Sequence, residues 1–151
     1  MPTTATFDEL TSLAGRDLGW TEWAQIAQDR VNTFADAVDD HQWIHTDPER
    51  AKDGPFGGAI AHGFLTLSLA TRFWSELLET EGVTTKVNYG LDKVRFISPV
   101  PVGSRVRMNA VIAEVEEVKG GGVQFTVDQT FEIEGSERPA VVARGLYRFY
   151  R

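Results

Sequence analysis

The second half of the chain contains a segment whose residue pattern constrains the fold more than any other part. Apolar side chains alternate with polar ones along it, and the apolar set is Val123, Phe125, Val127, Phe131 and Ile133. Successive side chains of a β-strand point to opposite faces, so the alternation predicts an antiparallel strand between a core and solvent. Further strands are predicted over residues 86–97, 104–118 and 140–150. The second half is therefore predicted to be almost entirely sheet.

Two features indicate how these strands bend and connect. The apolar positions in 104–118 change parity between Ile112 and Ala113, which predicts a bulge or a strong bend. Gly120, Gly121 and Gly122 lie between two predicted strands. That position favours a hairpin turn over a phosphate-binding loop, because the latter should open a helix. No nucleotide site is expected.

Short helices and loops are predicted in the first half. One helix face carries Val31, Phe34, Ala35 and Val38. This helix should end near Asp40, and Asp47 followed by proline predicts the start of another. His45 is therefore expected in the bend between two helices. A short strand is predicted over residues 20–26, and the glycine-rich stretch 52–58 predicts an irregular loop.

The most apolar stretch of the chain runs from His62 to about Leu78 and predicts a long helix. Apolar residues cover so much of its circumference that the helix should be buried. A buried helix followed by antiparallel strands predicts an α+β fold, with a curved antiparallel sheet wrapped around a long central helix. Because an edge strand needs protection from further pairing, the sheet also predicts a homodimer.

Composition limits the class of protein. A length of 151 residues predicts one domain over residues 1–151, and the absence of cysteine suits a reducing compartment. The N-terminus lacks a basic start followed by an apolar run, so we expect a soluble, cytoplasmic protein without a membrane partner. The formal charge of -7 argues against a nucleic-acid partner, because such binding depends on basic residues.

Asp40 and His45 are the strongest candidates for chemistry. They lie five positions apart across a predicted helix end, where a carboxylate and an imidazole could hold and activate one water. Spacing alone favours a structural role instead, with Asp40 as a helix cap. His41 and His62 are expected to be structural or supporting residues. The histidine spacings match no metal-binding pattern, so no metal site is expected.

The segment FADAVDDHQWIHTDPERAKDGPFGGAIAHGF, residues 34–64, resembles the hydratase motif of MaoC-like dehydratases. That motif contains an aspartate, a variable residue, asparagine, proline, an aliphatic residue and histidine. Asp40, Ile44 and His45 match it, whereas Gln42 and Trp43 depart from it. The similarity continues through IAHG, VRF and PVPVG, and it is closest to the nodulation-protein-N-like branch. The resemblance implies a hotdog fold.

The same resemblance implies an (R)-specific enoyl-CoA hydratase. Asp40 and His45 would be the catalytic dyad, and Gly63 and Gln42 would bind substrate, with the Gly63 N–H receiving the thioester oxygen. An amide at a helix N-terminus stabilises negative charge, which agrees with that role. Close packing of the helix on the sheet is an alternative reason for Gly63. The partner would be an acyl-CoA or acyl-carrier-protein thioester, with no separate cofactor.

Two alternative functions remain possible, and the role of one group of basic residues is undecided. A hotdog thioesterase would direct water at the thioester carbonyl, although the Asp40 and His45 pair favours hydration. A non-catalytic binding or pairing subunit is the second alternative, because Trp43 replaces a rigid proline. Four basic residues could contact coenzyme A phosphates, although solvated strand positions are the favoured interpretation: Lys93, Arg95, Arg105 and Arg107.

Overall fold

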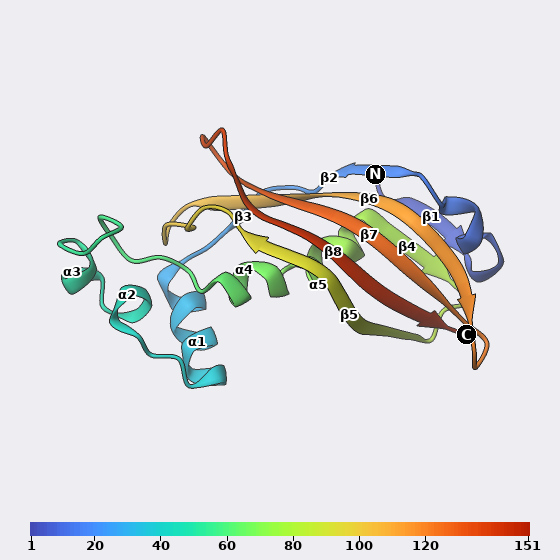
Figure 1. The fold of residues 1–151 in the computed structure, drawn as a ribbon, viewed down its shortest axis with the longest axis horizontal. Coiled ribbons are helices and arrows are strands. Elements are labelled where there is room, and N and C mark those ends of the chain that lie inside the picture. Colours follow the sequence, from blue (N-terminus) through green and yellow to red (C-terminus); the bar gives the residue numbers. More distant parts are fainter.

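A curved antiparallel sheet is the largest element of the computed structural model, which describes all 151 residues (Figure 1). Its strands are β2 (Asp17–Trp20), β3 (Ala24–Gln25), β5 (Thr85–Phe96), β6 (Arg105–Val118), β7 (Gly122–Ile133) and β8 (Pro139–Tyr150). The order is β2-β6-β7-β8-β5, and β3 also pairs with β6. The four long strands confirm the predicted segments. The strand predicted over residues 20–26 was wrong in extent, because two short strands separated by residues 21–23 take its place.

The predicted bend and turn of the sheet are both present. Pairing between β6 and β7 shifts register between Ile112 and Glu114, so Ala113 is the bulged residue. Gly120 and Gly121 have φ values of 90° and 77° in the turn between these strands. Two successive residues with positive φ match the right-handed twist of a hairpin, and glycine adopts this conformation without strain.

Two consecutive helices, α4 (Gly63–Ser68) and α5 (Ala70–Leu77), lie against one face of the sheet (Figure 1). The prediction of one helix from His62 to about Leu78 was wrong at two points. The Leu69 N–H bonds to both the Leu65 and Thr66 carbonyls, which tightens the helix locally and interrupts it. Leu78 begins a strand instead. The expected burial holds for one side of these helices, which carries Leu65, Phe73, Trp74 and Leu77, whereas Phe64 is 70% exposed.

The N-terminal residues form elements that have no periodic sequence pattern. Strand β1 (Thr3–Thr6) pairs in parallel with β4 (Leu78–Glu81), and a 3-10 helix, η1 (Phe7–Leu13), follows it. Leu10 and Leu13 of η1 are buried and join the same core as the sheet. The parallel pair therefore fixes the N-terminus to the end of α5.

Aromatic side chains form the centre of the core between α5 and the sheet. Trp74 stacks on Tyr147, with ring centroids 5.4 Å apart, and meets Phe125 edge-on at 5.5 Å. Gln129 occupies an inward position of β7, where its amide donates a 2.5 Å hydrogen bond to the Tyr147 hydroxyl. Burial raises the pKa of Tyr147. These contacts hold α5 firmly on the sheet.

Three short helices extend beyond one end of the sheet (Figure 1): α1 (Gln28–Val38), α2 (Trp43–Thr46) and α3 (Pro48–Ala51). The Asp47 carboxylate accepts a 3.1 Å bond from the Arg50 N–H, which confirms the predicted cap of α3. His45 lies inside α2, so its predicted place in a bend was wrong. The Gln42 carbonyl accepts from the His45 and Thr46 amides and closes that helical turn. No helix is long and apolar enough to cross a membrane.

Candidate active site

Asp40, His45 and His62 meet where the three short helices join the main body of the molecule. Asp40 follows α1, His45 belongs to α2, and His62 immediately precedes α4. One side-chain nitrogen or oxygen from each of the three lies within 4.8 Å of the others. The structure therefore brings together the predicted pair, Asp40 and His45, and adds His62 to it.

The turn that presents Asp40 depends on its neighbour. Asp39 has a φ of 57° and caps α1 in the left-handed conformation, with its N–H bonded to the Ala35 carbonyl. Aspartate is among the few non-glycine residues that adopt this conformation readily. The chain reverses there, and the Asp40 side chain remains 48% exposed beside His62.

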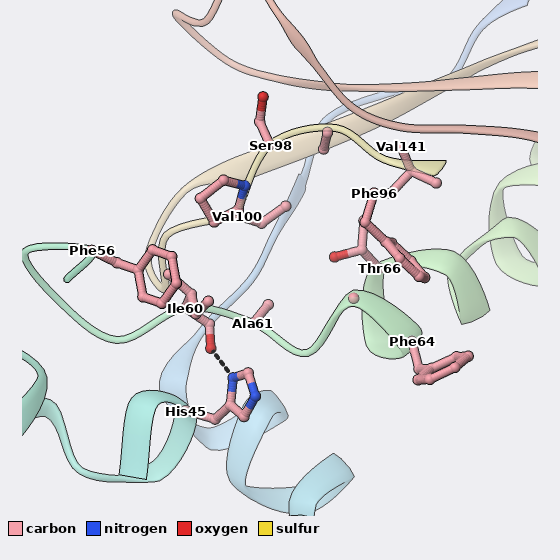
Figure 2. Close-up of a pocket in the computed structure, with 13 residues that line it drawn as sticks. His45, Phe56, Ile60, Ala61, Phe64, Thr66, Phe96, Ser98, Val100 and Val141 are labelled. Atoms are coloured by element: carbon pink, nitrogen blue, oxygen red, sulfur yellow. Dashed lines mark hydrogen bonds between the residues drawn. The ribbon is translucent and has the colours of Figure 1, made fainter. Parts of the chain in front are cut away.

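The position of the proton on His45 follows from its hydrogen bond. His45 is buried, and its Nδ1 lies 2.6 Å from the Ile60 carbonyl oxygen (Figure 2). A carbonyl oxygen only accepts, so Nδ1 must carry the proton in this bond. In the neutral ring Nε2 then has a free lone pair, which can accept a proton from water.

His62 supports both members of the pair. Its ring stacks on His45 with centroids 3.9 Å apart and an interplanar angle of 23°. Its Nε2 donates to the Asp40 backbone carbonyl at 3.0 Å and lies 3.9 Å from the Asp40 carboxylate. His62 thus fixes the Asp40 backbone and one face of the His45 ring, which fits the supporting role predicted for it.

The group of three residues suits water better than a metal ion. Lone pairs of imidazole nitrogens lie in the ring planes, and two nearly parallel stacked rings cannot aim theirs at one ion. A water that bridges two groups lies about 2.8 Å from each of them. The side-chain atoms of these three residues lie within 4.8 Å of one another, which leaves room for one such water. The arrangement can therefore hold a water between a carboxylate and a basic nitrogen.

A cavity of about 380 Å³ opens beside His45 (Figure 2). This volume lies within the range of small-molecule sites. Its walls are mainly apolar and include Phe56, Ile60, Phe64, Phe96 and Val100. The three aromatic side chains among them, Phe56, Phe64 and Phe96, are each about half exposed or more. An apolar molecule with a reactive end near His45 fits this shape.

Gly63 lies on the wall of the same cavity as the first residue of α4. Its N–H has no partner within the helix, because the first amides of a helix lack a preceding carbonyl. A Cβ atom at this position would lie 2.9 Å from the Phe96 ring. A side chain here would force the half-exposed Phe96 ring to shift, which agrees with the packing alternative, and the Gly63 amide is also free of any partner within the helix.

The two departures from the family motif lie at the start of α2. Gln42 is an exposed N-terminal cap residue whose side chain makes no hydrogen bond, and it does not line the cavity. Trp43 takes the first helical position, where proline is also favoured, and the Arg50 guanidinium lies over its ring at 4.3 Å. The substitution of proline is therefore compatible with the turn.

Most of the other candidate residues have partners elsewhere. The exposed His41 pairs with Asp36 at 2.8 Å. Arg105 forms an ion pair with Glu134 that lowers the pKa of that carboxyl, and Arg107 pairs with Glu132.

Thr66 and Ser98 also line the cavity. Neither residue belongs to a motif, so the sequence did not indicate them, although Thr66 shares a helix face with Gly63.

Comparisons with known proteins agree with this geometry. A family model described as MaoC like domain matches residues 9–132. The 3-hydroxyacyl-thioester dehydratase Z of Mycobacterium tuberculosis is 52% identical over 141 residues, covering 93% of each chain. Nodulation protein N of Rhizobium leguminosarum bv. viciae is 46% identical over 140 residues, covering 91% of this chain and 87% of that protein. The unliganded R-hydratase PhaJ1 from Pseudomonas aeruginosa has a TM-score of 0.72 at 20% identity, covering 91% of this chain and 82% of that one.

A curved antiparallel sheet over a central helix defines a hotdog fold, and the helices at one end of the sheet bring His45 to an apolar cavity. The chain belongs to the MaoC-like family, because the family model matches well over half of it. The resemblance found in the sequence, including the similarity to nodulation protein N, is confirmed.

The hydrogen bonds of the three histidines predict their protonation at a pH where the rings are neutral. We expect the proton on Nδ1 in His45 and on Nε2 in His41 and His62, because those atoms face a carbonyl or carboxylate oxygen. Heteronuclear NMR of the histidine rings distinguishes the two forms, with His41 as the exposed control. A proton on Nε2 of His45 would contradict the assignment.

Proposed function

We propose that this protein catalyses the (R)-specific hydration of trans-2-enoyl-CoA to (R)-3-hydroxyacyl-CoA, and the reverse dehydration. The observation that carries the proposal is that a carboxylate oxygen of Asp40 lies within 4.8 Å of a ring nitrogen of His45, which lines an apolar cavity. The 52% identity to a 3-hydroxyacyl-thioester dehydratase supports the same reaction. The chain is then a hydro-lyase.

The chemistry follows from the positions of the polar groups. Asp40 and the Nε2 of His45 hold one water, and Nε2 takes its proton as the oxygen attacks C3. The C2–C3 π electrons shift toward the thioester, and the Gly63 N–H stabilises the negative charge on its oxygen. The pair then returns a proton to C2 on the same face. One water is consumed, a C–O and a C–H bond form, and the enzyme regains its starting state.

The roles of the remaining candidates follow from this proposal. The substrate is a thioester of coenzyme A or of an acyl carrier protein, and no separate cofactor takes part. Gln42 acts through the turn that it caps rather than through contact with substrate, because it lies outside the cavity. A cytoplasmic location, with neither nucleic acid nor membrane as partner, completes the proposal.

The reaction is tested with purified protein and crotonyl-CoA. We expect loss of the conjugated-thioester absorbance and formation of the (R) alcohol alone, measured by chiral analysis of the product. Predominant (S) product would contradict the proposed geometry. Release of free coenzyme A would indicate a thioesterase, and an unchanged substrate would indicate a binding subunit.

Variants of Asp40 and His45 test the roles of the pair. We expect Asp40→Asn and His45→Gln each to reduce turnover by about 10²-fold or more, the usual scale for a positioned acid-base group. Since both act on one water, the double variant should be scarcely slower than the worse single variant. His41→Gln, at an exposed histidine outside the cavity, is the matched control.

Melting temperatures of the same variants separate chemistry from folding. A purely structural role predicts a lower melting temperature with nearly normal turnover per folded molecule. Near-normal turnover in a well-folded Asp40→Asn or His45→Gln variant would refute the assignment of the active site.

A homodimer formed through β5 is the assembly that we propose. β5 is the last strand in the sheet order, so one of its edges has no strand partner. Val87, Tyr89 and Leu91 of this strand are 41%, 53% and 48% exposed. A long apolar edge of this kind favours pairing with another strand, and a second copy supplies an identical one.

Light scattering at the assay concentration tests the assembly. We expect a dimer for the wild type and a shift toward monomer for Leu91→Lys, because a buried unpaired charge opposes association. Val38→Lys replaces an equally exposed apolar residue outside the sheet and should remain dimeric. A fully active wild-type monomer would rule out this assembly.

A further inference from the structure

Thr66 has a buried hydroxyl without a hydrogen-bond partner on the wall of the cavity. The residue is 1% exposed, and its Oγ1 contacts no donor or acceptor. Its backbone is fully engaged, since its N–H bonds to the His62 carbonyl at 3.2 Å. A threonine hydroxyl within a helix ordinarily bonds to a carbonyl three or four residues earlier. Here that local bond is not made, so the hydroxyl is free for another partner.

The helix geometry directs this hydroxyl toward the end of α4 that carries Gly63. Residues three apart share a helix face, and every Cα–Cβ bond tilts toward the helix N-terminus. The Thr66 side chain therefore reaches back over the turn that begins at Gly63. Figure 2 shows its hydroxyl pointing into the cavity, on the opposite side of it from His45.

The surroundings leave few other acceptors for this donor. Phe96, Val100 and Val141 line the cavity without a polar side chain, and the hydroxyl of Ser98, which also lines it, points away from Thr66 (Figure 2). An unpaired hydroxyl is unfavourable in such surroundings. The substrate of the proposed reaction supplies an acceptor, because its thioester carbonyl oxygen lies two carbons from the C3 atom attacked beside His45.

We propose that the Thr66 hydroxyl donates a hydrogen bond to the thioester carbonyl oxygen, alongside the Gly63 N–H. This inference rests on the proposed hydration and adds a side-chain donor to its oxyanion site. Negative charge grows on that oxygen when water adds at C3, so the bond strengthens between the ground state and the transition state. Thr66 thus acts mainly on kcat and only weakly on KM.

The test compares Thr66→Val, which removes the hydroxyl while keeping the shape, with Thr66→Ser, which retains the hydroxyl. Hydration of crotonyl-CoA is measured for both, together with the melting temperature. For Thr66→Val we expect kcat to fall by about 10- to 10²-fold, up to the lower limit for the loss of one oxyanion donor because the Gly63 N–H remains, with KM changed little. Thr66→Ser should recover most of the activity.

Stability should move in the opposite direction from activity. Removing an unpaired buried hydroxyl leaves the melting temperature of Thr66→Val equal to or above that of the wild type. The control is Ser68→Ala in the same helix, whose hydroxyl bonds to the Leu65 carbonyl outside the cavity, and its kcat should match the wild type. If Thr66→Val does not fold, Thr66→Ala removes the same donor and should show the same loss of kcat.

The outcomes separate this inference from the proposed function. Wild-type protein that leaves crotonyl-CoA unchanged overturns both. An active wild type with a Thr66→Val variant within about twofold of it in kcat overturns the role of Thr66 alone, since one hydrogen bond to a developing charge exceeds that factor. A loss of activity that Thr66→Ser does not restore, together with a lower melting temperature, also overturns it, because packing then explains the effect.

Discussion

The hydrogen bond between His45 Nδ1 and the Ile60 carbonyl joins the three short helices to the rest of the molecule. The backbone of Ile60 and Ala61 also bonds to both parts of the molecule, α2 on one side and the loop before β6 on the other. The Ile60 N–H bonds to the Ile44 carbonyl at 2.9 Å, and the Ala61 N–H bonds to the Val100 carbonyl at 2.8 Å. One stretch of extended chain thus sets the distance between α2, the loop before β6 and the start of α4. The position of the His45 ring depends on all three contacts.

This arrangement places rigid polar groups next to an apolar cavity. His45 and His62 are both nearly excluded from solvent and stack on each other, whereas Asp40 remains half exposed. Water can therefore enter from the side of Asp40 while an acyl chain occupies the apolar side. Buried hydrogen bonds are stronger in such surroundings than in water, so few polar groups are needed to fix orientation.

The sheet could be predicted from the sequence because its signals are local. Alternation located the strands, and the parity change at Ile112 and Ala113 located the bulge. The break at Leu69 could not be predicted, since leucine is a good helix former and the local sequence carries no glycine or proline. Strands β1 and β4 gave no signal either, because their pairing joins residues far apart in the sequence.

The site was predictable to a similar degree. The motif identified Asp40 and His45, but the stacking of His62 on His45 depends on the course of the loop between them. Gln42 takes the position of the motif asparagine, which implied contact with substrate, and yet it is exposed as a helix cap. Sequence position indicates which residues are near the site, whereas side-chain direction is decided by the turns that carry them.

The order of pairing in the sheet also sets the order in which the molecule can assemble during synthesis. Strands β2 and β3 pair with β6, and β1 pairs with β4, so each of these strands stays unpaired until its later partner has been synthesised. Ala140 and Val141 of β8, the last strand, line the cavity. A nascent chain therefore carries the motif with Asp40 and His45 long before the cavity wall exists. Such non-local pairing makes folding slower than in proteins dominated by local contacts. The binding site is completed only after Ala140 and Val141 have left the ribosome.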